Sequence, residues 1–439
     1  MQKIKSQFLK EQMLHYLRFF TKDHCLMVLY LFCLLFSPPV IPKINFIIPL
    51  AILSLAILAW AFRKNLLKLK ALFTKTAMHF FIKGFVVYMG YVLVVILFNV
   101  LISRSIDLSQ TFFVLYRCLL ICPILLICIF YVTVWARSRN YTLKEFMLCL
   151  LIAASLQGIL SLASLLFPEV KEILVKIMLF GTEDPLLANQ WHLERRFFGF
   201  ANNMYDGYGF GTGIFLALCF FCAAQWSKKF LIFAPLLFFP SFLNSRTGLV
   251  IFAIGVVISL PLFFDKRNKK SLLNLLLAVG VLLLAIVVIF LLIYCFSRPT
   301  FQWIMNILNL NKVDASLVKL FGDEFWNFPE GLQLIFGSGH TLYGADGFAH
   351  SDVGFVNDLW FTGILGTGFF YGVLVLLFRR VFKNVHDRPF KALVVYLGIS
   401  MIAYNVKSMA LTCNVGLVTV FLILFVLDIG YAKEEKLVN

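Results

Sequence analysis

Long apolar runs, separated by polar segments, recur along the whole chain. A helix needs about 20 predominantly apolar residues to cross a bilayer. The pattern therefore predicts an all-α polytopic membrane protein with about twelve spans, and an even number places both termini on one side. The predicted spans are residues 24–41, 44–62, 78–102, 111–135, 146–167, 207–226, 230–244, 248–264, 272–296, 353–378, 391–406 and 411–432.

The composition excludes an ordinary soluble protein. Hydrophobic residues make up 61% of the 439 residues and charged residues 14%. Soluble domains carry about 45–50% apolar and about 25% charged residues. We therefore expect residues 1–439 to form a single integral membrane domain.

The distribution of basic residues predicts the orientation in the membrane. The net charge is +17, from 39 Lys and Arg against 22 Asp and Glu. With a cytoplasmic N-terminus, 26 basic residues fall in cytoplasmic segments and 11 on the opposite face. Lys and Arg accumulate on the cytoplasmic side of membrane proteins. This explains the positive charge without a nucleic-acid partner and predicts that both termini are cytoplasmic.

Two long loops lie on the predicted outer face, at residues 168–206 and 297–352, whereas every predicted cytoplasmic loop is short. Because loops carry binding and catalytic residues more often than the elements they connect, we expect the chemistry on the outer face. Residues 169–180 place apolar side chains on one helical face. This segment is either an interfacial helix or a loop helix packed on the bundle.

Alternating glycines open the predicted span 207–226, at positions 207, 209, 211 and 213. A nucleotide-binding loop needs a strand before and a helix after the glycines, and no strand is expected here. Small residues also let two membrane helices approach closely. We therefore predict close helix packing at this segment.

Arginines mark two candidate sites for an anionic group. Arg195 and Arg196 end the first outer loop, and Arg246 stands between a short span with two prolines and the next span. Arginine binds phosphate oxygens with a planar fork and keeps its charge. Broken or short spans often mark binding sites in membrane proteins. The alternative is that these arginines anchor the protein to lipid headgroups.

The second outer loop carries the candidate acid–base residues. They are His340 in G-S-G-H, His350 and Asp352 in H-S-D-V-G, and Asp358 soon after. Histidine serves as a general base near neutral pH, and a neighbouring carboxylate can orient it. The spacing does not favour a zinc site. The alternative is that Ser351 or Asp352 caps the helix that begins near Val353.

The ordered motifs resemble those of a known family. They are R-x-x-G-x-x-N-N at 196–203, S-R-T-G at 245–248, G-S-G-H at 337–340, H-S-D-V-G at 350–354 and G-I-L-G at 363–366. Together they resemble the O-antigen polymerases (Wzy) and, more distantly, the O-antigen ligases of bacterial surface-polysaccharide assembly. The resemblance covers about residues 190–370 and the hydropathy profile of the whole chain.

The resemblance implies a glycosyltransferase of the bacterial inner membrane that joins undecaprenyl-pyrophosphate-linked repeat units on the periplasmic face. It implies that Arg196 and Arg246, with Arg195, bind the pyrophosphate, and that His350 and Asp352 act at the acceptor. His340 and Asp358 are further acceptor-binding candidates. The donor is already activated, so no cofactor is expected. The partners that the family implies, besides membrane lipid, are a chain-length regulator and a flippase.

Three other functions remain open at this point. An O-antigen ligase would share the arginines and transfer glycan to a lipid A core. A lipid-linked oligosaccharide flippase also has about twelve spans, although it does not need two long outer loops. A secondary transporter would show related halves and charged residues at the membrane midplane.

Overall fold

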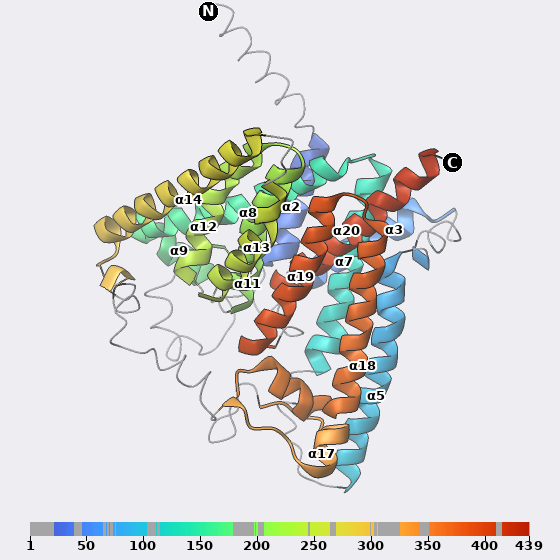
Figure 1. Cartoon of the computed structure of the whole chain (residues 1–439). Coiled ribbons are helices and arrows are strands. Elements are labelled where there is room, and N and C mark those ends of the chain that lie inside the picture. Colours follow the sequence, from blue (N-terminus) through green and yellow to red (C-terminus); the bar gives the residue numbers. More distant parts are fainter. Residues whose placement is uncertain are drawn as a thin grey trace, which may run out of the picture.

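The structure is a computed structural model whose regular elements, within the part of the chain it describes, are all helices. It describes residues 22–38, 46–64, 67, 70, 73–74, 76–102, 111, 115–178, 197, 199–200, 206–244, 246–263, 269–298, 300–302, 305, 325–342, 351–409 and 415–438. The all-α prediction is confirmed for these residues. Figure 1 shows a bundle of long helices, with α18 beside α5 and the short α17 packed near the beginning of α18.

The helices follow the predicted apolar runs in order. Within the described part of the chain, the elements begin with α2 (Lys22–Phe36), α3 (Ile47–Ala61), α5 (Ala77–Ile102), the π-helical η1 (Tyr116–Ile121), α7 (Cys122–Ser138), α8 (Leu143–Leu166) and α9 (Pro168–Met178). The next are α11 (Asp206–Gln225), the 3-10 helix η2 (Lys228–Phe233), α12 (Ala234–Asn244), α13 (Arg246–Phe263) and α14 (Lys269–Phe296). The last are α17 (Gly331–Phe336), α18 (Gly354–Asn384), α19 (Arg388–Lys407) and α20 (Val415–Val438). Each of the twelve predicted ranges contains a helix.

Among the described residues, six helices are long and apolar enough to cross a membrane. They are Ala77–Leu101, Leu119–Ser138, Leu143–Leu166, Gly207–Gln225, Gly354–Asn384 and Arg388–Lys407. Four further apolar segments are shorter, at Ile47–Ala61, Thr247–Phe263, Ile286–Phe296 and Val415–Gly430. The chain is therefore a membrane protein by its helices, and the number of twelve spans stays a prediction.

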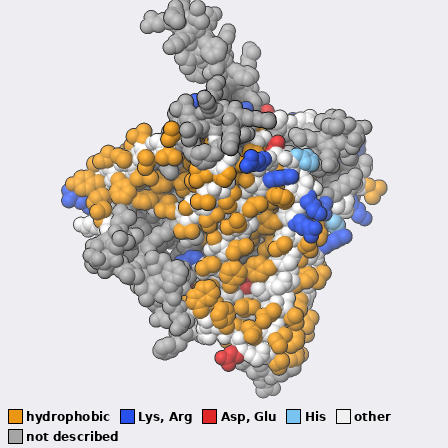
Figure 2. All heavy atoms as spheres, in the orientation of Figure 1, with side chains coloured by type: hydrophobic (Ala, Val, Ile, Leu, Met, Phe, Trp, Pro, Cys, Tyr) orange, Lys and Arg blue, Asp and Glu red, His pale blue; other side chains and the backbone are white. Residues whose placement is uncertain are grey.

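Apolar side chains cover much of the outside of the bundle. Figure 2 shows one face on which these side chains form a nearly continuous layer over the described helices. Val86, Val87 and Val94 of α5 are more than half exposed, as is Val375 of α18. A helix that is apolar on all sides is stable only when protein or lipid surrounds it. These faces are therefore suited to contact with lipid.

Helix α11 is the centre of the bundle and is buried along almost its whole length. It packs against α12, α13, α19 and α20. A Cβ atom on Gly213 would lie 2.4 Å from the Gly248 carbonyl oxygen, and one on Gly248 would lie 2.6 Å from the Gly209 carbonyl oxygen. The predicted close packing is confirmed, because only glycine allows α11 and α13 to approach this closely.

The first predicted outer loop begins with a helix, as the pattern at 169–180 predicts. Helix α9 follows α8 with only Phe167 between them and packs against it. Leu174 is 9% exposed and faces the bundle, whereas Ile173 is 57% exposed. The helix therefore packs on the bundle on one side and keeps an apolar residue on the other.

Candidate functional site

The second arginine motif lies at a break between two helices. Helix α12 has 11 residues, contains Pro240 and ends at Asn244, and α13 begins at Arg246. The sequence predicted this short, proline-containing segment. The Arg246 backbone therefore forms the first turn of α13, where helical N–H groups have no partner within the helix and favour an anion. The structure does not describe the position of the Arg246 side chain.

Asn244 binds the backbone of the first predicted outer loop through the oxygen and the nitrogen of its amide. Its Oδ1 accepts a hydrogen bond from the Phe197 N–H at 2.7 Å, and its Nδ2 donates to the Phe197 carbonyl at 2.8 Å. Asn244 is 1% exposed and Phe197 is 4% exposed, so both bonds are shielded from water. Its Nδ2 also donates to the Pro240 carbonyl at 2.9 Å, which fixes the amide at the end of α12.

This amide clamp brings together two motifs that are far apart in the sequence. Arg195 and Arg196 lie outside the described residues, but Phe197 is the residue next to Arg196. Asn244 stands two residues before Arg246, and two residues span at most about 7 Å. The clamp therefore joins the segment that follows the arginine pair to the helix end that precedes Arg246.

A second amide holds the same segment against α8. The Gln157 Oε1 accepts a hydrogen bond from the Phe200 N–H at 3.2 Å. Gly199 lies between the two amide contacts with a φ of +62°, and a Cβ there would meet the Gln157 Nε2 at 2.8 Å. The glycine of R-x-x-G is thus required by its backbone conformation and by the close approach to α8.

The G-S-G-H motif supports a break in α18. Gly363 has a φ of 64° and a ψ of −173°, so the helix is interrupted there. The carbonyl groups just before the break lose their helical partners and need other donors. The Ser338 N–H and hydroxyl both donate to the Trp360 carbonyl. The Gly339 N–H donates to the Phe361 carbonyl, and the Tyr91 hydroxyl donates to the Thr362 carbonyl. The motif therefore has a structural role that the sequence did not indicate.

His340 follows these donors and lies against the N-terminal half of α18. Its ring centroid is 5.6 Å from that of Trp360. The side chain is half-buried. His340 therefore lies beside the helix that follows the second predicted outer loop. Its role in binding an acceptor stays a prediction.

The H-S-D-V-G motif leads into the beginning of α18. His350 lies outside the described residues. Ser351 is buried, donates its hydroxyl to the Phe325 carbonyl at 2.6 Å and accepts from the Val353 N–H at 3.2 Å. The serine therefore anchors the segment just before α18. It does not cap the helix, because the N-cap residue is Val353 and has no side-chain cap hydrogen bond, so the capping alternative is wrong. Asp352 instead forms an ion pair with Lys407, with 3.3 Å between Oδ2 and Nζ.

Asp358 is a buried carboxylate in the N-terminal half of α18. Its Oδ2 accepts from the Tyr371 hydroxyl at 2.6 Å and from the Asn405 Nδ2 at 2.9 Å. Asn405 also donates to the Tyr371 hydroxyl, which closes a three-membered cluster between α18 and α19. The donors are neutral, and His340 is not among them. A carboxylate inside a membrane helix usually has a functional role, since its burial is costly.

The beginning of α11 connects the arginine side of the site with the Asp358 side. Tyr208 shares hydrogen bonds with Gln157 and with Ser161 of α8. Two residues later, the Phe210 ring stacks on Tyr404 of α19 with 4.4 Å between centroids. Tyr404 is the neighbour of Asn405 in sequence. Helix α11 therefore contacts Gln157, which binds the segment after Arg196, and Tyr404, the neighbour of Asn405.

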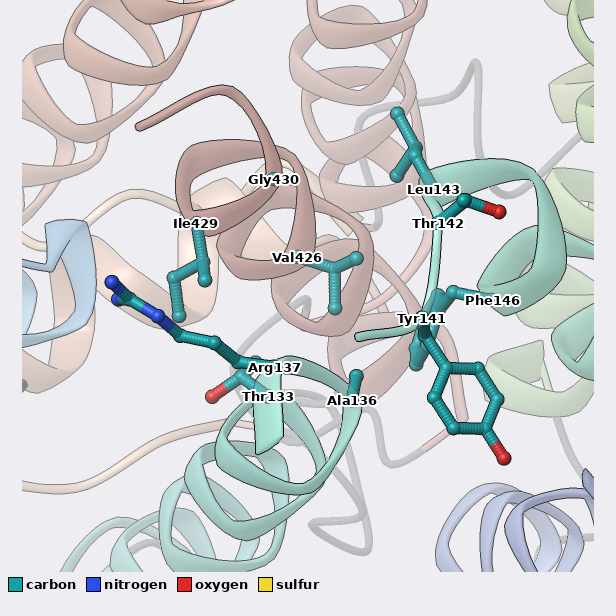
Figure 3. A pocket seen from close by; sticks show the side chains of 10 residues that line it. All are labelled: Thr133, Ala136, Arg137, Tyr141, Thr142, Leu143, Phe146, Val426, Ile429 and Gly430. Atoms are coloured by element: carbon teal, nitrogen blue, oxygen red, sulfur yellow. The ribbon is translucent and has the colours of Figure 1, made fainter. Parts of the chain in front are cut away.

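A separate pocket lies farther along α20, away from these residues. It is lined by residues of α7, α8, the turn between them and α20, and Arg137 is its only charged side chain (Figure 3). Val415, at the beginning of α20, packs against Gly211 of α11. Gly430, which lines the pocket, follows 15 residues later, which is about 22 Å along a helix. Burial raises the pKa of the Tyr141 hydroxyl in this pocket above its ordinary range. The pocket contains none of the predicted site residues.

Among the described residues, no three His, Cys, Asp or Glu side chains gather closely enough to hold a metal ion. No protein-family model matches the chain, and comparisons with curated proteins and with solved structures find no significant match.

Proposed function

We propose that this protein is a polysaccharide polymerase of the bacterial inner membrane with both termini in the cytoplasm. It transfers a growing glycan from undecaprenyl pyrophosphate to a new lipid-linked repeat unit on the periplasmic face. The amide clamp between Asn244 and Phe197 carries the proposal, because it ties the Arg195–Arg196 segment to the helix that begins with Arg246. A diphosphate has enough oxygens to bind arginines from both motifs.

The donor side of the reaction needs stabilisation of negative charge. As the bond between the anomeric carbon and the pyrophosphate oxygen breaks, the bonding electrons go to the leaving pyrophosphate. Arg196 and Arg246, with Arg195 beside them, bind its oxygens, and the N-terminus of α13 adds favourable N–H dipoles. The lipid tail stays in the membrane next to the apolar helices, so the leaving group remains at the bilayer surface.

The acceptor side needs an oriented hydroxyl group. Its oxygen attacks the anomeric carbon, and its proton passes to His350, with Asp352 orienting the acceptor or the imidazole. The ion pair with Lys407 holds the Asp352 carboxylate at the outer end of α19, where a sugar could approach. His340 and Asp358 would shape the same side of the site.

Reconstitution with defined substrates tests this proposal. The purified protein in liposomes, given only undecaprenyl-pyrophosphate-linked repeat units, should form a ladder of longer lipid-linked glycans. If the protein forms no ladder from these units alone but transfers glycan to lipid A core when the core is added, it is a ligase. Movement of the lipid-linked unit across the bilayer without any new glycosidic bond would indicate a flippase.

One observation favours a second candidate function. Asp358 lies in a membrane helix that is broken at Gly363, and discontinuous helices with buried charges are typical of secondary transporters. In that case Asp358 would bind a proton or cation during transport. Flux of a solute that depends on Asp358, in liposomes that form no glycan ladder, would support transport over polymerisation.

A further inference from the structure

We propose that a basic surface, formed where α5 begins, α18 ends and α19 begins, binds the headgroup of an anionic phospholipid. Its basic residues are Lys83, Arg379, Arg380, Lys383, Arg388 and Lys391. This basic surface lies at the predicted cytoplasmic end of the bundle, whereas Asp358 lies near the other end of α18. Lipid binding there is therefore independent of the reaction proposed for the outer face.

A buried carboxylate holds the beginning of α5 and the end of α18 together. Asp428 of α20 is 3% exposed. Its Oδ2 accepts a hydrogen bond from the Ala77 N–H of α5 at 2.7 Å, and its Oδ1 accepts from the Asn384 Nδ2 of α18 at 2.8 Å. Hydrogen bonds to a carboxylate are stronger than those between neutral groups. The backbones that carry the basic residues of these two helices are therefore fixed relative to each other.

The positive charges of the three helices converge. The charges of Lys83 on α5 and Arg380 on α18 both act on His79, near the beginning of α5. Helix α19 joins them through Lys391, whose Nζ lies 5.4 Å from the ring centroid of Phe382 on α18. Helices α5, α18 and α19 therefore supply basic side chains to one surface.

Much of this charge faces outward without an acidic partner. Four of the six basic side chains are exposed, namely Lys83, Arg379, Lys383 and Arg388. Within the part of the chain that the structure describes, none of these four forms an ion pair. The segment from the end of α18 to the beginning of α19 contains one acidic residue, Asp387. Because like charges repel, an anion bound at this surface would be stabilised by several cations at once.

Apolar side chains continue from these charges along the same helices, which favours a lipid over a soluble anion. About one turn after Lys83, Val86 and Val87 of α5 are 62% and 61% exposed, and Val375 of α18, about one turn before Arg379, is 64% exposed. Figure 2 shows basic side chains gathered at one edge of the apolar layer. A phospholipid can place its phosphate on the basic side chains and its acyl chains along the apolar faces. Basic clusters between membrane helices on the cytoplasmic side recognise anionic headgroups in this way.

Helix α8 provides a matched control on the same predicted side of the membrane. Lys144 stands in its first turn and is exposed. Among the described residues it forms no ion pair, so it resembles Lys83 in charge and exposure. Lys144 has no part in the basic surface. General attraction between the protein and an anionic membrane would use both lysines alike, whereas a defined headgroup site would use only Lys83.

Native mass spectrometry of the purified full-length protein in detergent tests the proposal, because it measures the affinity for single phospholipid molecules. The probes are phosphatidylglycerol, phosphatidylethanolamine with the same acyl chains, and glycerol 3-phosphate. Wild-type protein should prefer phosphatidylglycerol. One basic side chain at a membrane surface contributes about fivefold to this preference. Lys83→Gln should therefore weaken phosphatidylglycerol binding about fivefold and Lys144→Gln should leave it unchanged.

A triple variant extends the test. Lys83→Gln, Arg379→Gln and Lys383→Gln together should weaken phosphatidylglycerol binding about 100-fold and leave phosphatidylethanolamine binding unchanged. Lys83→Arg, Arg379→Lys and Lys383→Arg together keep the charge and should keep the preference. The substituted side chains are exposed, so the variants should fold normally.

Four results would overturn the proposal. They are equal affinity of the wild-type protein for the two phospholipids, wild-type affinity of the triple glutamine variant for phosphatidylglycerol, an equal loss in Lys83→Gln and Lys144→Gln, and displacement of phosphatidylglycerol by an equal concentration of glycerol 3-phosphate. The last result would indicate a site for a soluble phosphate. Ladder formation is measured separately, so each of these results leaves the proposed function intact.

Discussion

Replacing Asn244 by alanine should separate the two arginine motifs without removing any charge. The amide makes both hydrogen bonds to the Phe197 backbone and one to the Pro240 carbonyl. Alanine cannot replace any of them. The segment after Arg196 would then lose its attachment to α12, and the arginine pair would no longer be fixed relative to Arg246.

The size of the effect follows from the two bonds to Phe197. A hydrogen bond contributes about 0.5–1.5 kcal/mol net, so the clamp contributes about 1–3 kcal/mol to the docked arrangement. Because about 1.4 kcal/mol corresponds to a tenfold change, polymerisation at limiting donor should fall about 5- to 150-fold. The change also leaves the buried N–H and carbonyl of Phe197 without their hydrogen bonds to Asn244, so the midpoint temperature of thermal unfolding should fall as well.

The assay is the initial rate of ladder growth in liposomes, with protein abundance and thermal midpoint measured on the same preparations. Asn384→Ala is the control. It also removes a side-chain amide, one that is partly buried and donates to Asp428 at 2.8 Å at the far end of α18. The control should lose stability and keep its rate per folded molecule. A wild-type rate from Asn244→Ala at normal abundance would refute the reasoning.

Three further predictions concern single positions. Arg246→Ala should abolish long-chain polysaccharide on gels and Arg246→Lys should retain only a small part, because lysine lacks the planar fork; wild-type ladders from the lysine variant would indicate plain charge. Gly363→Ala should lower the yield of folded protein, because its backbone strain costs about 1–3 kcal/mol and the new Cβ would lie 2.3 Å from the Ile335 carbonyl oxygen. Gly368→Ala should leave the yield unchanged, because a Cβ at Gly368 would meet open space. Asp358→Asn should leave a buried donor unpaired and lower the thermal midpoint by a few degrees, and an unchanged midpoint would contradict that account.

The helices were predictable because a membrane span needs a run of apolar residues. Each predicted range contains a helix, but the helix ends differ from the predicted ones. The predicted span 353–378 continues as α18 to Asn384, through Arg379, Arg380 and Lys383. Hydropathy marks where a helix leaves the apolar layer, and it does not mark where the backbone stops being helical.

The interruption of α18 could not be predicted from its glycines. Gly363, Gly366, Gly368 and Gly372 look alike in the sequence, and only Gly363 has a positive φ. The difference comes from residues 337–339, which supply donors to the carbonyl groups before the break. That contact joins segments more than 20 residues apart, so local patterns carry no sign of it.

The charged residues of the site were visible in the sequence, and their amide partners were not. Arg246 is noticeable because a charge among apolar residues is costly. Asn244 stands in the same N-S-R-T-G segment, but its role depends on Phe197, 47 residues away. Asn405 and Lys407 gave a weak signal, as polar residues at the outer end of a predicted span.

The release of undecaprenyl pyrophosphate tests the central claim most directly. Purified protein in liposomes receives lipid-linked repeat units, and mass spectrometry counts the free undecaprenyl pyrophosphate and the glycosidic bonds formed in the same reaction. The account predicts one pyrophosphate released for each repeat unit added, with both quantities lost in Arg246→Ala. Wild-type protein that releases no pyrophosphate and forms no bond, although folded and supplied with its own organism's lipid-linked units, would contradict it.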